Sequence, residues 1–251
     1  MAVTIKSARE IELMREAGRL LALVHEELAK IIRPGISTKD IDRACEEMIR
    51  SYGCTPNFLN YQGYPGSVCV SVNEEVVHGI PTDRHIIQEG DIVSLDTGLI
   101  YQGYHSDAAR THAVGEVSSE AQKLMDVTKQ SFFEGIKMAK AGNHLFDISN
   151  AIDAYIRPYG YGIVRDLVGH GIGTHLHEEP EIPNCAQRRR GLRLQPGMTL
   201  AIEPMVNLGT ADVRWMKDGW TVISADHSLS AHYENTILIT EGEPEILTLR
   251  A

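Results

Sequence analysis

The sequence predicts an α/β protein of the α+β kind, in which about four helices back a curved, mostly antiparallel sheet. Two amphipathic helical patterns open the chain, short β-branched runs between turn residues follow them, and a helix–helix–strand unit occurs twice. No low-complexity segment or Pro/Gly-rich linker divides the sequence. We therefore expect residues 1–251 to form a single domain, long enough to bury a substantial core.

Two helices are expected near the start of the chain. Ser7 and Glu10 have the spacing of a capping box at the beginning of the first helix, and Pro34-Gly35 ends it. The second helix is expected from about Thr38 to Gly53. The apolar positions that give the first helix its periodicity are Ile11, Met14, Leu20, Leu21, Val24, Leu28 and Ile31.

Strands are expected where short β-branched runs are bounded by turn residues. The expected strands cover residues 67–72, 92–95, 108–114, 199–202, 221–224 and 236–240.

An internal repeat with a shift of 107 residues fixes the expected architecture. Residues 35–53 align with residues 142–160 at eight of nineteen positions without a gap. At the same shift, GDIVSLD (90–96) aligns with GMTLAIE (197–203), so that Asp96 and Glu203 become equivalent. Two copies of one unit predict a pseudo-twofold domain with both carboxylates near its axis.

Composition and charge exclude several classes of protein. Charged residues make up 23% and hydrophobic residues 43% of the chain, and the formal net charge is −10, which argues against stable nucleic-acid binding. The cluster Arg188–Arg190 is interpreted as a solvated turn. The apolar run at residues 20–24 is too short to span a membrane. Four scattered cysteines and no signal-peptide pattern lead us to expect a cytoplasmic protein with reduced thiols.

Four acidic residues and one histidine stand beside apolar strands or in turns. Asp96 follows IVSL, Asp107 precedes AARTHAV, and Glu203 follows TLAI. Glu234 precedes NTILIT, and His170 lies in the glycine-rich segment GHGIGTHLHEEP. Four converging carboxylates repel one another unless a cation lies between them. We interpret the set as ligands for two divalent ions, with Mn, Fe(II), Co and Zn all compatible. The alternative is a set of unrelated surface carboxylates.

Five segments, in order, resemble the motif blocks of the methionine aminopeptidases, and the likeness spans nearly the whole chain. The chain is most similar to the bacterial type I form, without a zinc-binding extension or a long insertion in its second half. The resemblance implies the pita-bread fold and removal of an initiator methionine that precedes a small residue. The segments are SVNEEVVHGIP (71–81), SLDTGLIYQGYHSDAART (94–111), GHGIGTHLHEEP (169–180), AIEPMV (201–206) and SAHYENTI (230–237).

The resemblance also implies roles for the five polar residues. Asp107 and Glu234 would bridge two metal ions. Asp96 would complete the ligands of one ion, and His170 and Glu203 those of the other. A water between the ions would attack the scissile carbonyl while Glu203 shuttles its proton.

Two further histidines gain roles from the resemblance. His177 would stabilise the tetrahedral intermediate, and His78 would contact the substrate amide beside the scissile bond. Neutral imidazoles suit both tasks. His175 matches no family role and is interpreted as structural.

The resemblance also implies an apolar pocket for the methionine side chain, formed by residues other than the metal ligands. Two of them depart from the bacterial pattern, since a small residue is usual at Phe58 and an aromatic residue at Leu176. Gln62 and His232 depart as well, from His and Gln respectively. Aromatic walls suit a thioether sulfur, although ordinary core packing would explain the same residues. The pocket positions are Phe58, Tyr61, Tyr64, Cys69, Leu176 and Trp220.

Two other functions compete with this interpretation. An X-Pro dipeptidase or aminopeptidase P has the same fold and ligands, but usually carries an additional N-terminal domain. A non-catalytic binding protein on the same fold would lose metal ligands, whereas all five are present here.

The expected partners are the N-termini of nascent polypeptides. We expect a monomer without membrane attachment, and the acidic charge leaves a transient ribosome contact open. Because Ala2 is small, we also expect the enzyme to remove its own Met1.

Overall fold

The computed structural model describes residues 3–250, so the expected removal of Met1 concerns residues outside the described range. The first helix begins as predicted: the Ser7 N–H donates to Glu10 Oε2 at 2.7 Å, and the Glu10 N–H donates to Ser7 Oγ at 3.4 Å. The helices within residues 3–250 are α1 (Ala8–Ile31), α2 (Thr38–Ser51), α3 (Ser119–Ile136) and α4 (Leu145–Ile156), with the 3-10 turns η1 (Tyr61–Gly63) and η2 (Arg157–Tyr159).

The strands form a nine-stranded sheet and two three-stranded sheets, and their pairings are antiparallel, as predicted. The large sheet contains β1 (Thr55–Pro56), β2 (Val68–Val72), β4 (Ile92–Tyr101), β5 (Tyr104–Ala113), β7 (Gly169–Gly171), β8 (Glu178–Ile182), β9 (Thr199–Ile202), β14 (Glu234–Leu238) and β15 (Glu245–Ile246). The small sheets contain β6 (Gly162–Ile163), β10 (Met205–Asn207) and β13 (Ser230–His232), and β3 (Glu75–Val77), β11 (Val213–Trp215) and β12 (Val222–Ser224).

The 107-residue repeat appears in the structure element by element. Helix α2 begins at Thr38 and α4 at Leu145, while β4 begins at Ile92 and β9 at Thr199, so each pair differs by 107. In the large sheet the order β4-β5-β14-β9 places the repeated strands β4 and β9 on either side of a central β5–β14 pair. The predicted pseudo-twofold arrangement is therefore present.

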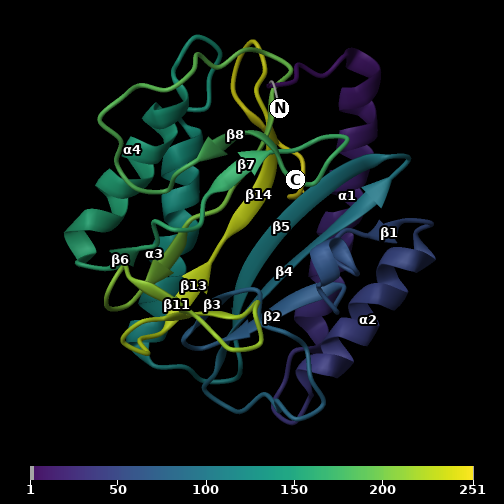
Figure 1. Ribbon diagram of the computed structural model, residues 1–251, viewed down its shortest axis with the longest axis vertical. Coiled ribbons are helices and arrows are strands. Elements are labelled where there is room, and N and C mark those ends of the chain that lie inside the picture. Colours follow the sequence, from purple (N-terminus) through teal and green to yellow (C-terminus); the bar gives the residue numbers. More distant parts are fainter. Residues whose placement is uncertain (1–2, 251) are drawn as a thin grey trace.

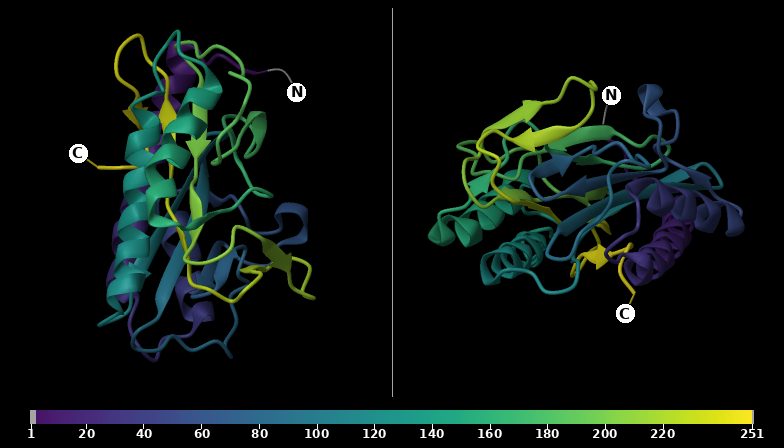
Figure 2. Two further views of the ribbon diagram at one scale, coloured as in Figure 1. Left: turned by 90° about the vertical axis from the view of Figure 1, so that its left-hand side faces the viewer. Right: turned by 90° about the horizontal axis from the view of Figure 1, so that it is seen from below.

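The helices cover one face of the large sheet, two on each half (Figures 1 and 2). On one half, α1 and α2 pack against β2 and β4 in a core that includes Leu21, Ile41 and Leu95. On the other half, α3 and α4 pack against β9 and β14 in a core that includes Phe132 and Ile148. The face away from the helices carries the cavity described below.

Some predicted strand boundaries are wrong. Asp96 and Asp107 were expected beside strands, but they lie inside β4 and β5, which form one long hairpin. Its two-residue turn, Gln102-Gly103, has positive φ values of 47° and 86°, as a tight hairpin turn requires, and so the pairing continues beyond the apolar run. His170 also lies within a short strand, β7, rather than in a turn. Among residues 3–250, no helix combines the length and apolar character needed to cross a membrane.

Candidate active site

Strand register places three of the acidic residues on one face of the large sheet. Asp96 on β4 and Glu234 on β14 both pair directly with Ala109 of the central strand β5. Asp107 precedes Ala109 by two residues, so its side chain points to the same face. The small Ala109 thus lies between two carboxylates from neighbouring strands, with the third beside it.

The remaining two residues approach from the other half of the sheet. His170 on β7 pairs with Ala201 of β9, and Glu203 follows the last residue of β9. One ligand atom from each of Asp107, His170 and Glu234 lies within 4.8 Å of the others. The His170 Nε2 lies 3.7 Å from Glu203 Oε1.

Burial makes this cluster of carboxyl groups electrostatically unfavourable on its own. Asp96, Asp107 and Glu234 are 9%, 4% and 2% exposed. Burial raises the pKa of Asp96 to about 7. Burial and the charge of Asp96 raise the pKa of Asp107 well above its ordinary value, and burial and neighbouring carboxylates do the same for Glu203 and Glu234.

Two oxygens in the cluster have no protein partner. Asp96 Oδ1 and Glu234 Oε1 are buried without a hydrogen bond within residues 3–250. A buried carboxylate oxygen without a donor is costly, and a cation compensates both the missing contact and the repulsion. The donor set and its unpartnered oxygens therefore fit divalent metal ions.

His170 has the form of a metal-binding imidazole. Its Nδ1 lies 2.8 Å from the carbonyl oxygen of Gly171, which fixes the proton on Nδ1 and leaves Nε2 with a free lone pair. Burial, followed by the charge of His177, lowers the pKa of His170 to about 3, so the ring is neutral. The rings of His170 and His177 stack edge to face, with centroids 4.5 Å apart.

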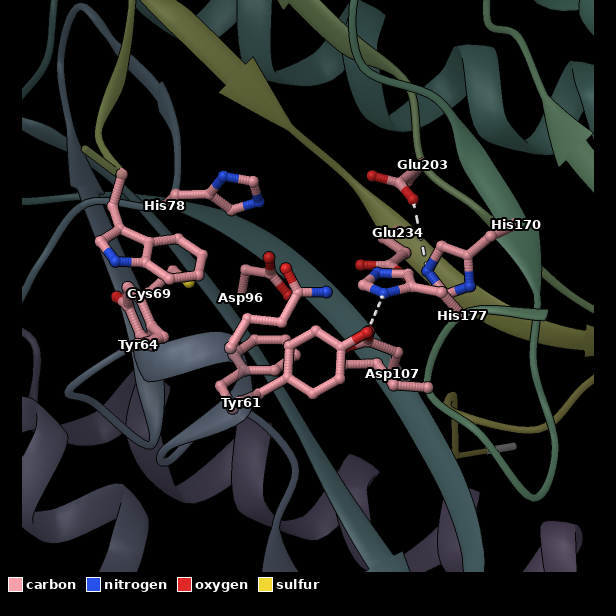
Figure 3. Close-up of a pocket in the computed structure, with 14 residues that line it drawn as sticks. Tyr61, Tyr64, Cys69, His78, Asp96, Asp107, His170, His177, Glu203 and Glu234 are labelled. Carbon is pink, nitrogen blue, oxygen red and sulfur yellow. Dashed lines mark hydrogen bonds and ion pairs between the residues drawn. The ribbon is translucent and has the colours of Figure 1, made fainter. Parts of the chain in front are cut away.

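His177 and His78 lie on opposite sides of the same cavity (Figure 3). The Tyr61 hydroxyl lies 2.8 Å from His177 Nδ1. Burial lowers the pKa of His177, and burial followed by the charge of His177 lowers that of His78 to about 4. Both rings are therefore neutral near pH 7, and His78 is held at a positive φ of 60°.

All thirteen predicted site residues line one cavity of about 200 Å³, and Gln62 is the additional lining residue. In Figure 3, Glu203, Glu234, His170 and His177 lie toward one side and Tyr64 and Cys69 toward the other, with Asp96 between them. The apolar side is formed by one packed cluster. Its members among the predicted residues are Phe58, Tyr61, Tyr64, Cys69, Leu176 and Trp220.

The sequence left several supporting contacts unpredicted. His232, noted only as a departure, is 1% exposed, and its Nε2 lies 3.7 Å from Glu203 Oε2. The Thr236 hydroxyl donates to the Asp107 carbonyl at 2.9 Å, and Asn184 Nδ2 donates to the Glu203 carbonyl at 3.1 Å. These contacts join residues that are not neighbours in the chain, so no local sequence pattern predicts them. His175 lies outside the cavity lining.

The fold and this acidic cavity define a metallopeptidase, and the chain belongs to metallopeptidase family M24, whose model matches residues 12–241. Methionine aminopeptidases are among its similar relatives. That of Clostridium acetobutylicum is 51% identical over 247 residues, covering 98% of this chain and 99% of the relative. Methionine aminopeptidase 1 of Bacillus subtilis is 49% identical, covering 98% and 99%.

Solved structures confirm the predicted pita-bread fold. The methionine aminopeptidase of Thermotoga maritima superposes with a TM-score of 0.97 at 44% identity, covering 99% of this chain and 100% of that one. An Xaa-Pro dipeptidase from Bacillus anthracis superposes with a TM-score of 0.80 at 27% identity, and 62% of its length is covered. That chain is thus considerably longer than the part shared with this protein.

Proposed function

We propose that this protein is a methionine aminopeptidase that removes the initiator methionine from polypeptides whose second residue is small. The single observation that carries the proposal is the shared cavity. Five metal-type ligands line this cavity together with aromatic and thiol side chains. A peptide N-terminus in this cavity would place an apolar side chain beside the cluster that acts on its carbonyl group.

Asp96, Asp107, His170, Glu203 and Glu234 would hold two divalent metal ions. When bound, such ions polarise a carbonyl and supply an activated water near neutral pH. Mn, Fe(II), Co and Zn all suit these ligands. Glu203 would carry protons between the attacking water and the leaving amine, because its carboxyl group lines the cavity beside His170.

The two histidines would orient the substrate through hydrogen bonds. We assign the Tyr61 hydroxyl as the donor to His177 Nδ1, an assignment that places the proton of neutral His177 on Nε2. That N–H would donate to the oxygen of the scissile group as its negative charge develops. His78, neutral and opposite His177, would hold the substrate amide next to the scissile bond.

The apolar side would select an unbranched side chain. Tyr64 and Trp220 meet edge to face with centroids 5.1 Å apart, and Cys69 lies in the same cluster. Aromatic and sulfur-containing walls favour a thioether. Phe58 and Leu176 belong to this cluster too, so the larger residue at 58 would compensate for the smaller one at 176 in the volume of the pocket.

The two competing functions are not favoured. The relatives that match nearly the whole chain at 43–51% identity are methionine aminopeptidases. A binding protein on this fold would not need five ligands gathered with two neutral histidines.

We further propose that the chain works as a single-domain monomer in the cytoplasm on nascent polypeptides, with at most a transient ribosome contact. The net charge of −10 supports the absence of stable nucleic-acid binding.

Peptide hydrolysis tests the proposed function. Metal-stripped protein, resupplied with Mn(II) or Co(II), is given Met-Ala-Ser and Ala-Pro-Gly. We expect free methionine from the first peptide only, and Glu203→Ala should abolish its release. Cleavage of Ala-Pro-Gly alone would assign the protein to the X-Pro enzymes, and cleavage of neither peptide by metal-loaded protein would refute the proposal.

A further inference from the structure

A buried ion pair outside the cavity lining joins the start of the chain to the segment that carries His177. Lys6 Nζ lies 2.6 Å from Glu178 Oε2, and both side chains are 4% exposed. Within residues 3–250, Lys6 is the only buried lysine. Burying such a pair gains little stability over an apolar pair, so its position suggests a role in fixing local conformation.

Glu178 closes the turn that precedes it. Its Oε1 accepts a hydrogen bond from the His175 N–H at 3.2 Å and lies 3.4 Å from the Thr174 hydroxyl. Its Oε2 accepts from the Thr4 hydroxyl at 2.7 Å as well as from Lys6. Burial raises the pKa of Glu178, but the hydrogen bonds from Lys6 and Thr4 outweigh that effect and keep the pKa below its ordinary value. Glu178 is therefore ionised, and its carboxylate binds the turn at His175 and the start of the chain at Thr4 and Lys6.

Lys6 is fixed in turn by the sheet. Its N–H donates to the Gly197 carbonyl at 2.8 Å, two residues before β9. Its side-chain stem lies against Gly173, where an added Cβ would come within 2.4 Å of Lys6 Cε and 2.6 Å of Glu178 Oε1. The Gly173 carbonyl also accepts from the His105 N–H at 2.8 Å. The glycine thus leaves the space that the lysine fills.

We propose that Lys6 and Glu178 are positioning residues for His177. A segment with glycines at 169, 171 and 173 has wide conformational freedom unless its surroundings restrict it. The ion pair restricts the backbone of this turn on one side, and the Tyr61 hydroxyl restricts the imidazole on the other. Residues near the start of the chain therefore help to set the geometry of the cavity. This inference rests on the proposed function for its kinetic consequences.

Three variants test it: Lys6→Met, Glu178→Gln and the double variant. Each single variant leaves one buried charge without the opposite charge, whereas the double variant removes both charges. We expect each single variant to lower kcat for Met-Ala-Ser by about 10- to 100-fold while KM changes by less than about threefold. Among the pocket residues, only Leu176 lies on the segment 172–178, whereas Phe58, Tyr61, Tyr64, Cys69 and Trp220 lie on others, so most of the substrate binding should persist. The double variant should recover part of the lost kcat.

Hydrogen–deuterium exchange supplies a readout independent of activity. In the single variants, the amides of residues 172–178 should exchange faster while those of β4 and β5 keep their protection. The matched control is Lys140→Met, which breaks the exposed pair of Lys140 with Glu243, whose side chains are 41% and 76% exposed. It should change neither kcat nor exchange at 172–178.

Each outcome decides the inference. Unchanged kcat and unchanged exchange at 172–178 in the single variants would overturn it, as would a uniform loss of protection or a rise in KM at constant kcat. If a single variant does not fold, the double variant is compared with the wild type, and an unaltered kcat and exchange pattern would again overturn it. An inactive wild type would refute the proposed function alone, because exchange at 172–178 still tests the positioning.

Discussion

Asp96 and Glu203 occupy equivalent positions in the two halves of the molecule, each four residues after the first residue of its repeated strand, β4 or β9. Both carboxyl groups line one cavity, and the charge of Asp96 contributes to the raised pKa of Glu203. The pseudo-twofold symmetry thus brings one acidic group from each half to the centre. The same symmetry that builds the sheet creates an electrostatic cost that a metal ion would relieve.

Metal binding should stabilise the folded protein, because the ions would bind the assembled ligands and not the unfolded chain. At a concentration about 100 times the Kd, Mn(II) should raise Tm by about 5–10 °C. Asp107→Asn should abolish most of this rise, yet leave the metal-free Tm equal or higher, since it removes a carboxyl group whose ionised form is disfavoured by burial and by Asp96. Calorimetry with and without metal measures both effects. The exposed Asp166→Asn serves as the control, and a normal metal-induced rise in Asp107→Asn would contradict the assignment.

Glu75 should make stability fall as pH rises. Burial, partly offset by its hydrogen bond from the Val72 N–H, raises its pKa from 4.5 to about 7. The folded state therefore binds the proton more tightly than the unfolded state, and stability declines between pH 4.5 and 7 by at most about 3 kcal/mol. Glu75→Gln should flatten this part of the profile in urea titrations. The same pH slope in Glu75→Gln would show that another group is responsible.

Tyr61→Phe should separate the pocket role of the ring from the hydrogen bond of its hydroxyl. The ring stays, but the 2.8 Å contact with His177 Nδ1 is lost, so the imidazole loses its orientation and its fixed tautomer. We expect kcat for Met-Ala-Ser to fall by about 10-fold with KM nearly constant. Tyr101→Phe is the control, because the Tyr101 hydroxyl accepts a hydrogen bond from the exposed Gln102 side chain at 3.0 Å and lies outside the cavity lining. An equal fall of kcat in Tyr61→Phe and Tyr101→Phe would exclude a specific role for the Tyr61 hydroxyl.

Phe58 and Leu176 should behave as a coupled pair. Phe58→Cys alone leaves a void in the packed cluster and should cost about 2–4 kcal/mol of stability, together with about 10-fold in kcat/KM for methionine. Leu176→Phe alone should overpack the same space. The double variant should recover most of both losses, as urea unfolding and peptide kinetics would show. Additive losses in the double variant would mean that the two side chains do not share one volume.

The sequence predicted the fold well where a signal was local or repeated. The capping box at Ser7, strand β9 and the 107-residue repeat all appear as predicted. The predicted strand ends at Asp96 and Asp107 were wrong, because the Gln102-Gly103 turn extends the hairpin through both residues. That turn was visible in the sequence as a dipeptide, but the polar residues after it obscured the strand.

Long-range contacts set the limit of sequence-based prediction for the site. Eight of the thirteen residues could be named because they stand in one of the five motif segments. The other five came only from the resemblance to the family: Phe58, Tyr61, Tyr64, Cys69 and Trp220. The contact between Tyr61 and His177, 116 residues apart, and the ion pair between Lys6 and Glu178, 172 residues apart, could not be predicted. Such pairs depend on how the two halves of the sheet meet, and no periodicity along the chain encodes them.

Anomalous diffraction from crystals soaked with Mn(II) tests the central claim most directly. We expect two anomalous peaks about 3.5–4 Å apart among Asp96, Asp107, His170, Glu203 and Glu234, with Asp107 and Glu234 contacting both. Crystals of Glu234→Gln grown alike should lose at least one peak. Wild-type crystals with no peak in this cavity, or with strong peaks only elsewhere, would contradict the claim that these five residues form a metal centre.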